Sequence, residues 1–590
     1  NQPFFDAGGR YQTFRPGQNS TVYPCPNVNT PSQADCPVGL VFPGDPGVPK
    51  GLTKPYYNSF APRIGIAWDP WKNGKMTIRG GFGVFYNPIE QLVLEQFQAE
   101  PPFGGSTTIS EGFFSTPFVL QSCGVPCGTV ATGGMGVGIL PNPFGSILDP
   151  PHGTPVPWAN FRPITLFGEL QPQLRSQYTE QYNLGIEREV FKNTVLTVGY
   201  VGSQGHRLLA THDLSPGNAQ TCLDLQALAN AYPGDGTAAH PGIGTSCGPF
   251  FADSSFSIPT QAYNSSGTLV NVVTPAGGLH LPYGVKGPSV IPGGTLVSGV
   301  APSGITLVGL RPYSSPTCDP LTGTGCPVDG TPVFSSIYAQ DTIANSAYNS
   351  LQASLEHRFS NGLQFEIAYT FSKSIDDASS FENSLKPICN GVLNSFSCNR
   401  SLSLFDARQR LVISYLWQIP VPKYNGAKGR LLDGWAVSGI TSFQSGFPIR
   451  MQTLDDQELE NDVSGFEAPG RPIETGPVAF LNPRKNSNYY FCNGGAGAAG
   501  CNIQDPPLGS LGGPRTICCG AGINNFDMSL QKGIPIGETV HAEFRAEFFN
   551  IFNHTQFLNP DGNFSDGPDF GRVTHTRDPR QIQFALKVAF

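Results

Sequence analysis

The sequence of residues 580–590, Arg-Gln-Ile-Gln-Phe-Ala-Leu-Lys-Val-Ala-Phe, decides the fold class, because its side chains alternate in character with a period of two. In a β-strand, successive side chains point to opposite faces of the sheet. The segment therefore predicts a strand with one apolar face and one face of Gln, Ala and Lys. The apolar face consists of Ile582, Phe584, Leu586, Val588 and Phe590.

Ten further segments along the chain alternate in the same way. We expect one more strand near residues 10–15 or 38–43. Each segment is long enough to form a strand and too short to be read as a membrane-spanning helix. The expected strands occupy residues 60–69, 75–86, 177–190, 194–204, 348–359, 363–372, 409–419, 432–443, 524–531, 539–551 and 580–590.

The links between these segments alternate in length. Antiparallel barrels of bacterial outer membranes have short periplasmic turns on one rim and long external loops on the other. The sequence therefore predicts an all-β fold, an antiparallel transmembrane β-barrel, with residues 1–590 forming one barrel segment. A soluble sheet with one solvated face gives the same alternation and remains the alternative. Short links are expected at 70–74, 191–193, 360–362, 420–430 and 532–538, and long ones at 87–176, 205–347, 373–408, 444–523 and 552–579.

The composition narrows the choice of partners. Charged residues make up 13% of the 590 residues, and the net charge of −8 argues against a nucleic acid partner.

No apolar run approaches the roughly 18 residues that a membrane-spanning helix needs, whereas a barrel strand needs only about 9–11. Residues 1–10 read like the interior of a protein, so we expect the chain to be a fragment.

The fourteen cysteines avoid the expected strands and short turns. After the first pair, every pair lies in a long link. Even numbers of locally spaced cysteines in an exported protein predict disulfides, here in external loops. Zinc binding is disfavoured, because no second pair with metal-ligand spacing accompanies Cys123 and Cys127. The pairs are Cys25/Cys36, Cys123/Cys127, Cys222/Cys247, Cys318/Cys326, Cys389/Cys398, Cys492/Cys501 and Cys518/Cys519, with the connectivity within 492–519 left open.

The polar faces of three strands carry the candidate functional residues. Several ionisable side chains on one face fit a wet barrel interior better than a packed core, where burial of charge is costly. These side chains would either contact a solute in the lumen or form a charge ladder that braces the wall. The candidates that face the lumen are His541, Glu543, Arg545, Glu547, Gln352, Glu356, Arg358, Gln364 and Glu366.

Other polar segments have simpler interpretations. The acidic stretch 455–462 could bind Ca²⁺, but it lacks the order of an EF-hand, and a solvated acidic loop is favoured. His206 and His212 are read as solvated loop histidines rather than metal ligands. Residues 495–500 satisfy G-x-G-x-x-G without a preceding strand or a following helix pattern. We therefore expect no enzymatic activity, no cofactor and no metal site.

Six short motifs, in this order and spacing, resemble the barrel of Oar-like TonB-dependent outer-membrane receptors. The resemblance implies a barrel of about 22 strands, of which this chain supplies about 11–12 from the C-terminal part. The family's plug, TonB box and N-terminal regulatory domain are not recognisable. The motifs are NSFAPRIG (58–65), RGGFGVFY (79–86), YNSL (348–351), FSKSID (371–376), FDAR (405–408) and AEFFNIFN (546–553).

The resemblance also implies function and partners. It implies import of an unidentified solute across the outer membrane of a Gram-negative bacterium, with energy from the TonB complex acting through the missing N-terminal region. Phe590 resembles the C-terminal signal that the barrel-assembly machinery reads, and outer-membrane lipid would surround the strands. The alternatives are a surface-exposed binding or adhesion protein and a secreted soluble β-rich binding module.

Overall fold

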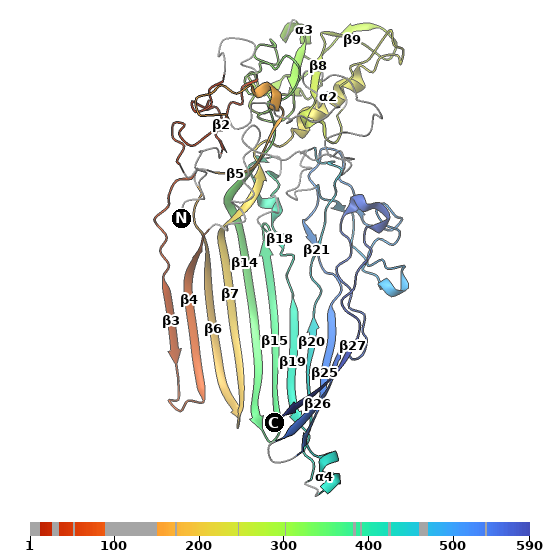
Figure 1. The fold of residues 1–590 in the computed structure, drawn as a ribbon. Coiled ribbons are helices and arrows are strands. Elements are labelled where there is room, and N and C mark those ends of the chain that lie inside the picture. The colour runs from red at the N-terminus through yellow and green to blue at the C-terminus, as the bar shows by residue number, and fades with distance from the viewer. Residues whose placement is uncertain are drawn as a thin grey trace, which may run out of the picture.

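The structure is a computed structural model that shows a tall sheet with most of the loops gathered at one end and short connections at the other (Figure 1). In the described part of the chain, no helix is long and apolar enough to cross a membrane. The structure describes residues 12–25, 35–50, 53–88, 150–171, 174–245, 247–300, 303–380, 385–389, 392–422, 426–459, 470–536 and 540–590.

Eleven strands of the main sheet follow one another in sequence order, and each is antiparallel to its neighbours. This arrangement confirms the eleven expected strands. Among the described strands, β3 and β27 each pair on one side only, so the sheet has two open edges. The strands are β3 (Arg63–Trp68), β4 (Met76–Asn87), β6 (Gln177–Phe191), β7 (Thr194–Asp213), β14 (Phe334–Ser360), β15 (Leu363–Asp376), β19 (Gln409–Gln418), β20 (Trp435–Gln444), β25 (Ile523–Pro535), β26 (His541–Phe549) and β27 (Gln581–Ala589).

A two-residue turn joins β14 to β15. Ser360 pairs with Leu363 across the turn residues Asn361 and Gly362. The φ angles of Asn361 and Gly362 are 51° and 80°. A type I′ turn needs positive φ at both central positions, which Asn and Gly tolerate best. The Asn-Gly pair therefore sets the pairing next to the turn, and a register shift between His357 and Ser360 then places Glu356 opposite Glu366.

The link between β19 and β20 is longer than the sequence predicts. The expected tight link at 420–430 is wrong, because β19 ends at Gln418, β20 begins at Trp435, and helix α4 (Gly426–Leu432) lies between them. A helix of seven residues spans only about two turns, which is too short for a recognisable helical period. In Figure 1, α4 lies beyond the lower ends of the strands.

Strands β7 and β14 extend beyond the expected 194–204 and 348–359. Their extensions pair with each other, and β5 (Ile164–Leu170) adds to β14 in parallel. Residues 334–340 of β14 are all buried. A strand that is covered on both faces has no apolar–polar alternation, so the period-two pattern could not detect the extension.

The long loop between β7 and β14 has a hydrophobic core of its own. Helix α2 (Ala219–Ala231) begins after Asn218, whose Oδ1 accepts a hydrogen bond from the N–H of Thr221 at 3.0 Å. The core contains Leu225, Ile258 and Leu279, which are fully buried, together with Leu459 from the loop between β20 and β25. Two loops that are far apart in sequence therefore share one core.

The additional strand expected near residues 10–15 or 38–43 is not part of the main sheet. Strands β1 (Thr13–Phe14) and β2 (Leu40–Val41) pair with each other instead. Phe14 and Leu40 are buried in a second loop core with Trp158 and Phe334. Strands of two residues are too short to cross a membrane and serve here to order the loops.

The remaining elements lie mostly in the long loops. They order these loops locally through two-stranded pairings. Strand β18 (Ser401–Leu402) pairs with β15. The others are β8 (Ser255–Ile258), β9 (Gln261–Tyr263), β10 (Leu269–Asn271), β11 (Leu279–His280), β12 (Val290–Ile291), β13 (Ile305–Val308), β16 (Ile388–Cys389), β17 (Val392–Leu393), β21 (Ile449–Arg450), β22 (Ile473–Glu474), β23 (Ile503–Gln504), β24 (Thr516–Ile517), α3 (Val297–Val300) and the 3₁₀ helices η3 (Trp158–Phe161), η4 (Phe251–Asp253), η5 (Ser397–Asn399), η6 (Pro483–Lys485) and η7 (Phe564–Asp569).

Candidate functional site

The main sheet separates its side chains into a polar face and an apolar face. Directly paired residues of an antiparallel ladder lie on the same face, so the register assigns each strand position to one of them. The rows Glu356–Glu366–Ser414–Ile440–Asp527 and Gln364–Leu416–Ser438–Ser529–Glu547 cross neighbouring strands on the polar face.

The register brings together the residues that the sequence assigns to the lumen. Those on β14, β15 and β26 share the polar face, and Arg358 joins them through its Nε, 4.0 Å from Oε1 of Glu356. That this face lines the lumen stays a prediction. The residues that share the face are His541, Glu543, Arg545, Glu547, Gln352, Glu356, Arg358, Gln364 and Glu366.

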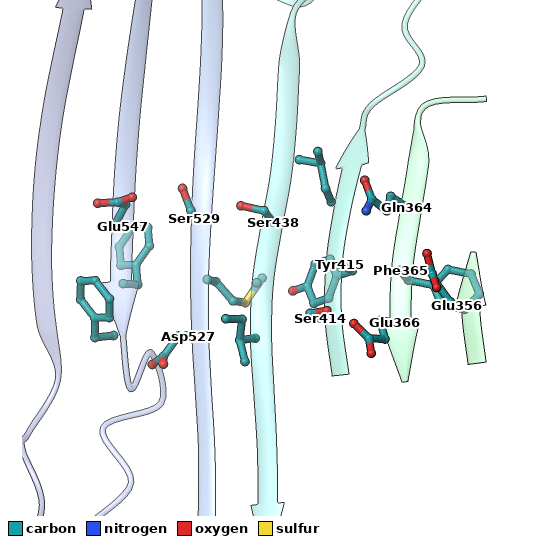
Figure 2. A pocket seen from close by; sticks show the side chains of 16 residues that line it. Glu356, Gln364, Phe365, Glu366, Ser414, Tyr415, Ser438, Asp527, Ser529 and Glu547 are labelled. Atoms are coloured by element: carbon teal, nitrogen blue, oxygen red, sulfur yellow. The ribbon is translucent and has the colours of Figure 1, made fainter. Parts of the chain in front are cut away.

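A hollow of about 440 Å³ lies against strands β14, β15, β19, β20, β25 and β26. Figure 2 shows its lining side chains, which the strands present at similar heights. Four carboxylates line it, and none of the lining residues is basic. The carboxylates belong to Glu356, Glu366, Asp527 and Glu547.

Four polar residues of the hollow were not among the sequence candidates. Ser414, Ser438, Asp527 and Ser529 line it from the central strands β19, β20 and β25. They occupy polar-face positions of the period-two pattern. This pattern is therefore the sequence signal by which they could be predicted. Charged residues cluster on β14, β15 and β26, whereas these four residues stand singly among uncharged neighbours in the sequence.

The hollow concentrates negative charge. Glu356 of β14 is directly opposite Glu366 of β15. Like charges at directly opposed cross-strand positions destabilise a sheet. A wet interior that screens the charges, or a cationic group placed between them, would relieve this repulsion.

Polar contacts along β26 fit the charge-ladder interpretation. Arg545 donates from Nε to Oε1 of Glu543 at 2.6 Å. On the neighbouring strand β27, Gln583 donates to a carboxylate oxygen of Glu547. These contacts connect polar-face side chains to one another, while contact of the same residues with a solute stays a prediction.

A second hollow, of about 530 Å³, adjoins the first and shares Asp527 and Phe549 with it. It lies toward the long loops and is lined by Arg410 and Arg577, together with Asp578 and several side-chain amides. The polar face therefore offers a continuous track, with guanidinium groups near the loops and carboxylates further along the strands.

The sequence matches one protein-family model, the outer membrane beta barrel domain, over residues 1–583. The chain belongs to this family. The sheet is therefore the wall of an outer-membrane β-barrel, and the chain resides in the outer membrane. No curated protein matches the chain.

Several solved outer-membrane proteins are similar to this chain at low identity. The outer membrane transporter YddB from Escherichia coli is 9% identical, with a TM-score of 0.36 over 90% of this chain and 40% of that one. The siderophore receptor PirA from Acinetobacter baumannii is also 9% identical, with a TM-score of 0.31 over 90% and 41%. The ferripyoverdine receptor of Pseudomonas aeruginosa is 10% identical, with a TM-score of 0.30 over 90% and 32%. This outer-membrane barrel chain thus spans less than half the length of these proteins.

The apolar face of the barrel wall is widely exposed. Phe584 and Leu586 of β27 are 68% and 69% exposed. Phe590 is 98% exposed and lies just beyond β27, at the end of the sheet where the short connections lie (Figure 1). Large exposed apolar surface is expected where strands face lipid. The role of Phe590 in assembly stays a prediction.

Disulfides of the barrel lie in its loops, as the sequence predicts. The structure also settles the connectivity within 492–519, which is sequential. Cys123 and Cys127 lie outside the described residues. The disulfides join Cys25 to Cys36, Cys222 to Cys247, Cys318 to Cys326, Cys389 to Cys398, Cys492 to Cys501 and Cys518 to Cys519.

Residues 455–459 of the acidic stretch fasten three loops together, and we refer to them as the latch. Asp456 accepts a hydrogen bond from the N–H of Phe250 at 3.1 Å, and Leu459 enters the core of the β7–β14 loop. Glu458 forms a buried ion pair with Lys386 of the β15–β19 loop. The expectation of a solvated acidic loop is therefore wrong for the latch, because Asp456, Glu458 and Leu459 are buried in contacts between loops.

His212, the penultimate residue of β7, differs from its expected environment. His212 is 4% exposed and packs edge-on against Phe396, so its reading as a solvated histidine is wrong.

Burial and the neighbouring Asp455 raise the pKa of Asp505 to about 6. Among the described residues, no group of three His, Cys, Asp or Glu side chains could hold a metal ion.

Proposed function

We propose that residues 1–590 act as one barrel segment of a TonB-dependent outer-membrane transporter that imports a solute. The role is transport rather than catalysis. The observation that carries the proposal is the continuous polar track formed by the two adjoining hollows on the polar face. A solute that enters between the long loops would meet Arg410 and Arg577 first and the carboxylates of Glu356 and Glu366 afterwards.

The remaining partners follow from the sequence resemblance. A plug and the TonB complex would act through the N-terminal region that is not recognisable in this chain. The barrel-assembly machinery would read Phe590 during insertion. The solute is not identified, and a track with guanidinium groups at one level and carboxylates at another suits a polar molecule with groups of both charges.

Energy-dependent uptake tests the proposal. The full-length protein is expressed in a host that lacks its own copy, with and without a functional TonB complex, and uptake is followed for a panel of radiolabelled siderophores, oligosaccharides, peptides and cobalamin. We expect uptake of one class that depends on both the protein and TonB. Uptake of none of the classes, or uptake that persists without TonB, would contradict the proposal.

A pair of variants on one strand links uptake to the polar face. Glu366→Leu changes the hollow, whereas Ile367→Leu changes the adjacent position of β15, which lies on the apolar face and does not line the hollow. We expect Glu366→Leu to reduce the uptake rate several-fold and Ile367→Leu to leave it within twofold at equal outer-membrane abundance. Equal effects of the two variants would remove the polar track from the transport route.

The latch favours one rival function. Two loops share a core, and a buried ion pair joins the third loop to them, so the three form a surface that suits a binding or adhesion protein. Such a protein would bind its partner at the cell surface without TonB and would release no solute into the periplasm. The TonB-dependent uptake experiment therefore separates the two functions.

A further inference from the structure

The connection between β19 and β20 differs from the other short-rim connections. Residues 419–434 contain α4, whereas β6 and β7 are joined by residues 192–193, and β14 and β15 by residues 361–362. A hairpin needs only two residues to reverse its direction, so a connection that contains a helix exceeds what the sheet requires.

Two contacts fasten the end of α4 to the apolar face of the barrel wall. Trp435 is opposite Lys532, which is opposite Phe544, so the three residues share the apolar face. The indole Nε1 of Trp435 donates to the carbonyl oxygen of Leu431 at 3.0 Å. The ammonium group of Lys532 donates to the carbonyl oxygen of Asp433 and lies 5.5 Å from the centre of the Trp435 ring.

Lys532 would be costly on a lipid-facing surface without these contacts. Only 5% of its surface is exposed, because Trp435 and the end of the connection cover it. Long basic side chains near a membrane boundary reach toward the headgroup level, where their charge stays solvated or paired. The position of the Lys532 ammonium group therefore marks the headgroup level of the short-connection rim.

At that level the connection presents apolar and basic groups side by side. Leu431 and Leu432 are 68% and 37% exposed, and Lys428 is exposed on the same helix. Between Gly426 and Trp435 the sequence contains Lys428 and Arg430 against one acidic residue, Asp433. Exposed leucines beside basic residues are typical of helices that lie in the interface of a membrane with anionic lipid.

We propose that residues 426–434 form a membrane-surface anchor that binds anionic phospholipid headgroups of the periplasmic leaflet. Leu431 and Leu432 enter the boundary between headgroups and acyl chains, and Lys428 contacts lipid phosphate. Lipid is favoured over a protein partner because the exposed leucines are continuous, through Trp435, with the lipid-facing surface of the wall.

Photo-crosslinking of the full-length protein tests the anchor. Benzoylphenylalanine replaces Leu431 in one variant and Val328, which is 85% exposed in the β7–β14 loop, in a control variant. The proteins are reconstituted in vesicles of phosphatidylcholine with 20% phosphatidylglycerol, irradiated and analysed by mass spectrometry. We expect phospholipid adducts at position 431 with phosphatidylglycerol enriched at least threefold over its share, and none at position 328.

A charge variant and a cellular experiment complete the test. Lys428→Gln should lower the enrichment of phosphatidylglycerol to its share in the vesicles and leave the total adduct at position 431 unchanged. In whole cells, the adduct at position 431 should again be phospholipid. No lipid adduct at 431, or a dominant protein adduct in cells, would overturn the anchor, and enrichment that survives Lys428→Gln would overturn its specificity for anionic headgroups.

Discussion

Removal of the Lys386 ammonium group should open the latch. The side chains of Lys386 and Glu458 are 3% and 2% exposed, and Oε1 of Glu458 also accepts a hydrogen bond from the N–H of Arg471 at 2.6 Å. Lys386→Met keeps most of the buried volume but leaves the carboxylate without its counter-charge. Breaking a buried ion pair in this way costs about 3–5 kcal/mol.

Hydrogen exchange of a backbone N–H that is bonded to the latch measures this loss of free energy. The N–H of Gly509 donates to the carbonyl oxygen of Gln457 at 2.7 Å, so its exchange reports opening of the latch. At about 1.4 kcal/mol for each factor of ten, the exchange rate should rise on the order of 10²- to 10³-fold. Peptides from β19 should keep their protection, because the ladder bonds of this strand do not involve the latch.

The double variant Lys386→Met/Glu458→Gln provides the control. A neutral amide can still accept the bond from Arg471, and replacing both members of a buried pair is often close to neutral. Exchange at Gly509 should therefore return to within about tenfold of the unmodified protein. Unchanged exchange in the single variant, or no recovery in the double variant, would refute the conclusion that this ion pair holds the loops together.

Three further predictions concern the wall, a loop and the C-terminus. Glu366→Gln removes the like charge opposite Glu356 and should raise the free energy of unfolding by about 0.2–1 kcal/mol in a urea titration in detergent, and a decrease would contradict the cross-strand repulsion. Because burial and Asp455 raise the pKa of Asp505 from 3.8 to about 6, the folded protein binds this proton more tightly than the unfolded one and gains stability as the pH falls from 6 to 4. Asp505→Asn should therefore raise the melting temperature at pH 7.5 and change it little at pH 4, whereas equal shifts would count against the raised pKa. Deletion of Phe590 should lower the outer-membrane abundance of the full-length protein on immunoblots while Phe590→Trp is tolerated, and unchanged abundance after deletion would remove the assembly role.

The strands of the membrane wall were predictable because each has one lipid-facing and one polar face. Residues 580–590 show the reason, because successive side chains of the strand face two different surroundings, and this imposes the alternation. The extension of β14 to Phe334 has no such contrast, because both of its faces are buried. The Asn361–Gly362 turn was marked by its own residues, whereas α4 was too short to show a period.

The contacts between loops could not be predicted from one sequence. Lys386 and Glu458 lie in different loops and carry charges that, in sequence, look like ordinary solvated residues. Their pairing depends on where the shared loop core places Leu459, which is a tertiary effect without a local signal. Disulfides such as Cys389–Cys398 were predictable because both partners lie in the same loop.

The number of strands in the open sheet restricts what can close it. Eleven strands that alternate in direction begin and end with the same direction, so β3 and β27 run parallel to each other. Joining these two edges, or joining two copies of this sheet that share one orientation in the membrane, would create parallel seams in an otherwise antiparallel wall. Only an odd number of additional strands can close the wall with antiparallel pairing throughout. The complementary wall must therefore begin and end with strands that run opposite to β3 and β27, and a second copy of the sheet with the same orientation in the membrane does not meet this requirement.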